Sequence, residues 1–251
     1  MNPPTVDYTK DELLTVRAAH AIADAEVVFV GIGLPNRAAN LAKLTHAPNV
    51  QLLYESGIYG SMPDRWPESI GDSCLVVNSL AVQSMAELFL FYLQRGHVDV
   101  GFLGAAQIDR FGNLNTTVVG DYRQPTTRLP GSGGACDIAA LSKRLVVTLP
   151  LSLRTFPERL DFVTSPGGRS RDGLQRNAGP PMTVITDLAV FKFDDESGEM
   201  ELQSLQPGAT LQEVQRHMGW RPRIAQHLDA AAEPTVEELA LMRRMTARRA
   251  G

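Results

Sequence analysis

One glutamate, Glu55, directly follows a short apolar run at residues 50–54 that is typical of a buried strand. A residue just past the carboxyl end of a parallel strand faces the ligand crevice of an open sheet. Gly57 and Gly60 follow closely, and their missing side chains are expected to let a bulky substrate approach the carboxylate. Glu55 is therefore a candidate nucleophile, and a solvated strand-end glutamate is the alternative reading of its position.

A second segment with chemical potential is the glycine cluster Gly131-Ser132-Gly133-Gly134-Ala135, which opens an apolar run at residues 138–141. Successive backbone N–H groups in such a cluster can converge on an anion, and they can stabilise the oxyanion that forms when a carboxylate attacks a thioester. A flexible glycine loop is the alternative. The chain contains no complete GxGxxG, GxxxxGK[ST], HExxH or GxSxG motif, and its histidines and cysteines show no metal-ligand spacing.

The elements that must position these residues alternate between strand and helix in the first half. Thr9 and Glu12 form a capping-box pattern that predicts a helix to about Asp24. A wholly apolar strand is expected at 27–30, a turn at 31–35, a helix at 38–44 and a strand at 50–54. Two strands joined by one helix predict a βαβ unit with neighbouring parallel strands.

The second half has a different pattern. Ser84 predicts the start of a helix that ends at Gly96, and residues 110–137 are expected to form long functional loops. Further strands are expected at 98–103, 145–149, 182–186, 189–193 and 200–202, with a final helix capped by Thr235 and Glu238. The predicted fold class is α/β, with an open, largely parallel sheet flanked by helices and with antiparallel strands in the C-terminal half. One domain is expected over residues 1–251.

Composition narrows the class of protein. The formal net charge is −4, with 43% hydrophobic and 21% charged residues, which is typical of a globular chain without general attraction to nucleic acid or to an anionic membrane. Cys74 and Cys136 are the sole cysteines, and the sequence contains no run of about 18 apolar residues and no secretory signal pattern. These features favour a cytoplasmic protein without a disulfide framework.

Five segments in register resemble the β subunits of family I coenzyme A-transferases, and the corresponding subunit of glutaconate CoA-transferase in particular. Residues 54–60 resemble the family's SENG-type motif, and Gly131 to Ala135 resemble its GxGG motif. Residues 104–109, 120–122 and 163–167 look like further matching segments, and the resemblance runs from about residue 7 to residue 245. One departure is Ser56, which stands where the family usually has asparagine and which points to the glutaconate-type branch.

The resemblance implies CoA transfer by ping-pong chemistry through an acyl-anhydride and a glutamyl-CoA thioester on Glu55, without ATP, metal or a permanently bound cofactor. It implies that the N–H groups of Gly133 and Gly134 bind the oxyanion, with Gly131 and Ala135 in the same coenzyme A-binding segment. It also implies a separate α subunit, and it favours a dicarboxylic or branched acyl group. The expected residues of the substrate pocket are Ser56, Gly57, Gln107, Asp109 and Arg128.

Several alternatives stay open at this point. Gln107 and Asp109 can instead hydrogen-bond the loop after a strand, and Arg128 can brace its own loop by a salt bridge. Arg169 and Arg171 can contact the phosphates of coenzyme A or belong to a solvated basic loop. The same scaffold also supports hydrolysis or decarboxylation of CoA thioesters. A non-catalytic subunit that binds a small acid or a sugar phosphate is the alternative from another class.

Overall fold

The computed structural model describes residues 7–31, 33–167 and 180–247. The chain forms two compact units. Unit 1 comprises residues 1–102 and 232–251, and unit 2 comprises residues 103–231, so that unit 1 is built from two separate stretches of chain. The expectation of one domain over residues 1–251 stays a prediction. Arg169 and Arg171 lie outside the described residues.

Unit 1 is built on a sheet with the strand order β5-β1-β2-β3-β4. The strands are β1 (Val27–Val30), β2 (Gln51–Tyr54), β3 (Ile58–Tyr59), β4 (Ala81–Val82) and β5 (Val100–Gly104). The central strand β1 runs parallel to both β2 and β5, which confirms the predicted βαβ unit. The short strands β3 and β4 add to β2 in antiparallel fashion and were not predicted.

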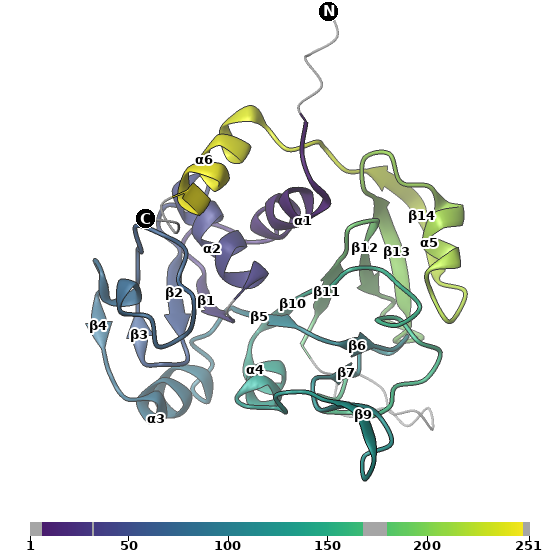
Figure 1. Ribbon diagram of the computed structural model, residues 1–251, viewed down its shortest axis with the longest axis horizontal. Coiled ribbons are helices and arrows are strands. Elements are labelled where there is room, and N and C mark those ends of the chain that lie inside the picture. The colour runs from purple at the N-terminus through teal and green to yellow at the C-terminus, as the bar shows by residue number, and fades with distance from the viewer. Residues whose placement is uncertain (1–6, 32, 168–179, 248–251) are drawn as a thin grey trace, which may run out of the picture. The chain divides into compact units, whose positions relative to one another are not determined.

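Three helices of unit 1 pack together beside β1 (Figure 1). They are α1 (Lys10–Ala19), α2 (Leu34–Leu44) and α6 (Val236–Ala247). The capping box of Thr9 and Glu12 is present, but α1 ends at Ala19 rather than near Asp24. Helix α2 begins within the segment predicted as a turn, because Pro35 suits the first turn of a helix, where its missing N–H has no intrahelical partner.

Aromatic contacts place another helical segment of unit 1 against the sheet. The segment contains the 3₁₀ turn η1 (Ser73–Val76), the helical turn α3 (Met85–Glu87) and the π-helical turn η2 (Leu88–Leu93). The rings of Phe89 in η2 and Phe29 in β1 meet edge to face at 5.3 Å, and Tyr92 lies 5.4 Å from Tyr59 in β3. Ser84 caps this helical segment as predicted. The helix continues as a π-helical turn, an uncommon geometry that often occurs near functional sites.

Unit 2 carries a mixed sheet with the order β10-β11-β12-β13-β14. Its strands are β10 (Arg144–Thr148), β11 (Met182–Ile185), β12 (Ala189–Phe193), β13 (Met200–Leu205) and β14 (Arg223–Ala230). Antiparallel pairing of β11, β12 and β13 confirms the predicted hairpins. Strand β14 and helix α5 (Leu211–Arg216) were not predicted, although Thr210 and Glu213 form a capping box that the sequence displays.

The segment expected as long loops at residues 110–137 contains regular structure in unit 2 (Figure 1). It pairs into two small antiparallel hairpins and ends in a helix. These elements are β6 (Gln107–Ile108), β7 (Leu114–Asn115), β8 (Val118–Gly120), β9 (Pro125–Arg128) and α4 (Ala135–Leu141). Parallel strands flanked by helices, together with the antiparallel strands of unit 2, confirm the predicted α/β class.

Candidate active site

Glu55 occupies the tight turn that joins β2 to β3 in unit 1. The N–H of Gly57 donates to the carbonyl of Tyr54 at 2.9 Å, and Tyr54 pairs with Ile58 across the hairpin. Three residues therefore form the loop, with Gly57 at a φ of +103°. This is the usual build of a three-residue hairpin loop, in which the last position requires the left-handed region. The turn holds the half-buried Glu55 at the carboxyl end of β2, as predicted.

The two glycines beside Glu55 serve the packing of the chain itself. A Cβ on Gly57 would lie 1.8 Å from the carbonyl oxygen of Gln83, and one on Gly60 would lie 2.6 Å from the side chain of Leu80. The expectation that these glycines leave room for a substrate is therefore wrong at their α-carbons. They let the segment around β4 approach the hairpin closely.

The residue before Glu55 anchors the strand end to α2. Tyr54 is fully buried, and its hydroxyl accepts a hydrogen bond from Nδ2 of Asn40 at 3.0 Å. Burial raises the pKa of the Tyr54 phenol well above its usual range, so the ring stays neutral. Nδ2 of Asn40 also donates to Oδ1 of Asn36 at 2.9 Å. This buried network fixes the backbone from which Glu55 projects.

The carboxylate of Glu55 is uncommitted. In the part of the chain that the structure describes, it forms no hydrogen bond and no ion pair. The neighbouring Ser56 is half-buried, and its Oγ is shielded from solvent without a hydrogen-bond partner among the described residues. A half-buried carboxylate without a cation beside it keeps its lone pairs available for attack on an electrophile.

The predicted glycine cluster of unit 2 has the backbone geometry of an anion-binding nest. Gly133 has a φ of +47° and Gly134 a φ of −84°, an alternation between left- and right-handed conformations that turns successive N–H groups to one side. Neither N–H has a hydrogen-bond acceptor among the described residues, whereas the N–H of Ala135 donates to Ser132 at 2.7 Å. Gly131, with a φ of +94°, begins this segment.

Gln107 and Asp109 use their polar atoms within the loops of unit 2. Nε2 of Gln107 donates to Asp161 at 2.8 Å, and its Oε1 accepts from Asn115 at 2.7 Å. Asp109 accepts from the N–H groups of Phe111 and Asn113 and from the Asn113 amide, while burial raises the pKa of its carboxyl. These contacts match the alternative of loop bracing. A contact with substrate stays a prediction for both.

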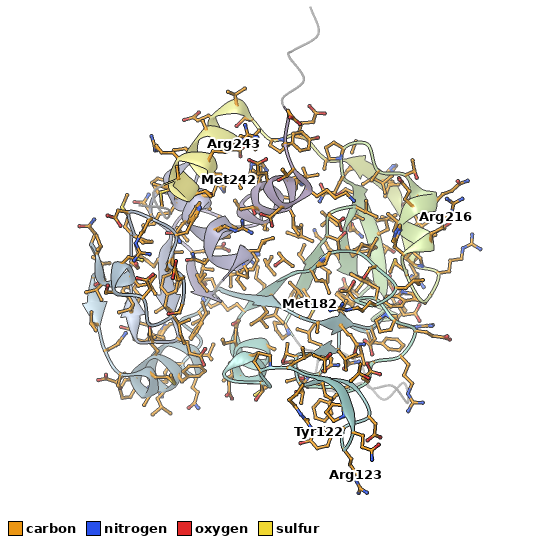
Figure 2. The ribbon with its side chains drawn as sticks, in the orientation of Figure 1. Tyr122, Arg123, Met182, Arg216, Met242 and Arg243 are labelled. Carbon is orange, nitrogen blue, oxygen red and sulfur yellow. The ribbon has the colours of Figure 1, made fainter. Side chains whose placement is uncertain are left out.

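Arg128 braces the β8–β9 hairpin through groups other than a carboxylate. Its Nη2 donates to the carbonyl of Tyr122 at 2.9 Å, and its guanidinium lies 4.9 Å from the centre of the Tyr122 ring. Figure 2 shows Tyr122 and Arg123 at the tip of this hairpin. Arg128 is exposed, and its predicted contact with a substrate carboxylate stays a prediction.

A cavity of about 630 Å³ lies elsewhere in unit 1 and contains none of the predicted site residues. Its lining residues are His20, Leu44, Thr45, His46, Thr235, Glu237 and Glu238. Several polar groups there already have partners, since Nε2 of His20 lies 2.5 Å from Glu238, which also caps α6. We assign no ligand to this cavity.

Comparison with known proteins decides the family. The family model described as Coenzyme A transferase matches residues 12–217. The chain belongs to this family. It is 46% identical over 247 residues to one subunit of the 3-oxoadipate CoA-transferase of Pseudomonas knackmussii, with 97% of this chain and 95% of the relative covered. The predicted resemblance to coenzyme A-transferases is thereby confirmed.

Solved structures agree with this membership of the coenzyme A transferase family. The crystal structure of glutaconate coenzyme A-transferase from Acidaminococcus fermentans is 32% identical, with a TM-score of 0.86 and 96% of this chain and 95% of that chain covered. The decarboxylase AibA/AibB is 26% identical, with a TM-score of 0.83 and 96% of both chains covered. Among the described helices, none has the length and apolar character needed to cross a membrane.

Sequence reasoning missed Gln83, which borders the Glu55 turn. Its N–H donates to the carbonyl of Gly57 at 3.0 Å, and its own carbonyl lies against the α-carbon of that glycine. Strand β4, which leads into Gln83, has two residues, too few for a periodic pattern. The repeated glycines at 57 and 60 were the available signal, because glycine within a strand pattern often marks close backbone approach.

Proposed function

We propose that this chain is the subunit that carries the catalytic glutamate of an acyl-CoA:carboxylate CoA-transferase, with Glu55 as the nucleophile. Membership of the coenzyme A transferase family supports CoA transfer in general. The observation that carries the finer assignment is the uncommitted, half-buried carboxylate of Glu55 at the carboxyl end of β2.

The proposed reaction balances in four displacements at Glu55. The carboxylate attacks the acyl-CoA carbonyl, and the CoA thiolate leaves an acyl-glutamyl anhydride. That thiolate then attacks the glutamyl carbonyl, and the first carboxylic acid leaves as its anion. An incoming carboxylate attacks the glutamyl-CoA thioester and again releases the thiolate. Attack of the thiolate on the new acyl carbonyl yields the product acyl-CoA and restores Glu55.

The glycine nest is the second part of the proposal. The N–H groups of Gly133 and Gly134 are the proposed donors to a tetrahedral oxyanion, and Gly131 and Ala135 belong to the same coenzyme A-binding segment. Two N–H groups without a protein acceptor support this role, because preorganised donors stabilise charge that develops in a transition state.

A second, α-type subunit is part of the proposed enzyme. The similar proteins are named as single subunits of their enzymes, which supports assembly with a further chain. Unit 1 also displays large apolar side chains from η1 to η2, with Leu80, Val82 and Phe91 exposed by 69%, 62% and 61%. Exposed apolar surface on this scale is typical of an interface between proteins.

The proposed acyl group is dicarboxylic. The names of two similar proteins specify 3-oxoadipate and glutaconate, and both are dicarboxylic acids. Such a substrate has a second carboxylate for the enzyme to recognise, and Arg128 is the predicted partner for it. Ser56, Gly57, Gln107 and Asp109 remain the other proposed residues of the pocket.

Exchange of CoA between an acyl-CoA and a labelled free acid tests the proposal in the assembled enzyme. Glu55→Gln keeps the shape of the side chain but removes the nucleophile, so exchange should fall by about 10⁴-fold or more. Glu237→Gln changes an exposed glutamate on α6 and should retain activity. Borohydride added after acyl-CoA should reduce the thioester and change the mass of the peptide that contains residue 55. Substantial exchange by Glu55→Gln would exclude this mechanism.

Decarboxylation is the second candidate function, because AibA/AibB has the same fold at a TM-score of 0.83. Release of carbon dioxide from an acyl-CoA without any acid acceptor would favour it. Exchange of label between two acids would favour transfer. The two outcomes are separated by one assay with and without the free acid.

A further inference from the structure

Two buried polar atoms beside Glu55 lack hydrogen-bond partners. They are Oγ of Ser56 and Nε2 of Gln83, both shielded from solvent and without a partner among the described residues. Buried side-chain polar atoms almost always have a partner, because an unmade hydrogen bond inside a protein is costly. Two exceptions within one turn therefore call for a functional reason.

The main chain of Gln83 is held firmly while its amide is not. The backbone N–H donates to Gly57 at 3.0 Å, and the backbone carbonyl fills the space that a Cβ on Gly57 would occupy. The next residue, Ser84, caps α3 through a capping box with Glu87. The structure therefore fixes where the side chain of Gln83 begins and leaves its two amide hydrogens without an acceptor among the described residues.

The proposed reaction creates a demand for such donors. Two of its four displacements occur at the acyl carbon, and the other two occur at Cδ of Glu55 itself. The second pair places a tetrahedral oxyanion on the glutamyl side chain, at every formation and every breakdown of the thioester. That oxygen stays within reach of the turn that carries Glu55, whichever acid is bound.

We infer that Nε2 of Gln83 and Oγ of Ser56 donate to the oxyanion on Cδ of Glu55, after a side-chain rotation that accompanies substrate binding. The inference rests on the proposed function. Neutral donors suit this position, since a cation would pair with the free carboxylate and weaken it as a nucleophile. Shielding from water strengthens a hydrogen bond to an oxyanion.

The test compares Gln83→Met and Ser56→Ala with the wild-type protein in the assembled enzyme. Each variant should slow both exchange and the appearance of glutamyl-CoA thioester by about 10²-fold. The KM for acyl-CoA should change by less than about 3-fold, because the lost contact exists only in the transition state. The unfolding temperature should stay the same or rise, since an apolar group replaces an unpartnered polar atom.

Two matched controls lie at the other end of the β2–β3 hairpin. Oε1 of Gln51 and Oγ of Ser61 are also buried without a partner among the described residues, and Gln51 begins β2, the strand that Glu55 follows. Gln51→Met and Ser61→Ala should keep the wild-type rate of exchange.

The outcomes separate the inference from the function on which it rests. Wild-type rates in Gln83→Met and Ser56→Ala would overturn the inference alone. Equal losses in the variants and their controls, in step with lost stability, would also overturn it and assign a structural role. A wild-type enzyme without exchange on any acyl-CoA would remove the proposed function and the inference together.

Discussion

The hydroxyl of Tyr54 donates to Oδ1 of Asn36 at 2.6 Å and so ties the end of β2 to the first turn of α2. Tyr54→Phe removes this donor and leaves buried amide groups of α2 without a partner. We expect a loss of about 1–3 kcal/mol in the free energy of unfolding. The unfolding temperature should fall by about 2–4 °C per kcal/mol in a chain of this size. Thermal unfolding measures the change.

Tyr59→Phe is the matched control for Tyr54→Phe. Tyr59 keeps its ring beside Tyr92 at 5.4 Å, and its hydroxyl forms no hydrogen bond among the described residues. Its removal should change the unfolding temperature by less than about 2 °C. Equal effects of the two substitutions would show that the buried network does not stabilise the strand end.

Gly57→Ala should damage the Glu55 turn more than a positive φ alone requires. Alanine at a positive φ costs about 1–2 kcal/mol, and at position 57 its Cβ would also lie 1.8 Å from the Gln83 carbonyl. Gly96→Ala carries only the first cost, because Gly96 has a φ of +72° and no atom within 4 Å of the added Cβ. Exchange assays and urea unfolding of both variants should show lost activity in Gly57→Ala alone. Similar activities would contradict close packing at this turn.

Gly134→Pro tests the nest by deleting one N–H. The φ of −84° at this position is close to the value that proline requires, so the backbone should keep its path. If this N–H binds an oxyanion, exchange should fall by about 10²–10³-fold while the unfolding temperature stays close to that of the wild-type protein. Gly134→Ala retains the N–H and should retain most activity. Activity that falls equally in both variants would point to lost shape instead.

Asp72 should make stability sensitive to acid. The guanidinium of Arg65 holds the pKa of this carboxyl far below its usual range by hydrogen bonds of 2.8 and 2.9 Å, helped by backbone N–H groups. A folded-state pKa below the unfolded value, near about 3.9, stabilises the fold above that pH. The stabilisation is lost as pH falls from the unfolded value towards the folded one.

The measurement is urea unfolding at several pH values from about 6 to 3. Asp72→Asn should be less stable than the wild-type protein at neutral pH and should lose less stability on acidification. Asp195→Asn, at an exposed position between β12 and β13, should follow the wild-type curve. Parallel curves for Asp72→Asn and the wild-type protein would show that the pair with Arg65 contributes no acid sensitivity.

Features written in neighbouring residues were predicted well. Thr9 with Glu12 and Thr235 with Glu238 cap helices where the patterns placed them, since a capping box needs only residues three apart. Strands β1 and β2 followed from apolar runs, and the position of Glu55 followed from the end of β2.

Features that depend on distant residues were not predicted. Strand β14 is polar and exposed along most of its length, so no periodic pattern marks it, and its pairing with β13 defines it. The close approach of Gln83 to Gly57 joins residues 26 positions apart, which single-residue propensities cannot register. The unpartnered state of the Gln83 amide is a property of packing and has no signature in composition.

The split make-up of unit 1 has a consequence for protein synthesis. Helix α6 docks on α1, where Arg243 lies 2.7 Å from Glu12, and Trp66 donates to Thr246 at 3.0 Å. Translation completes residues 103–231 before it reaches α6, although domains commonly fold in their order of synthesis. On the ribosome, the half of the protein that bears Glu55 therefore waits for the last helix, and the inserted half has its whole chain first.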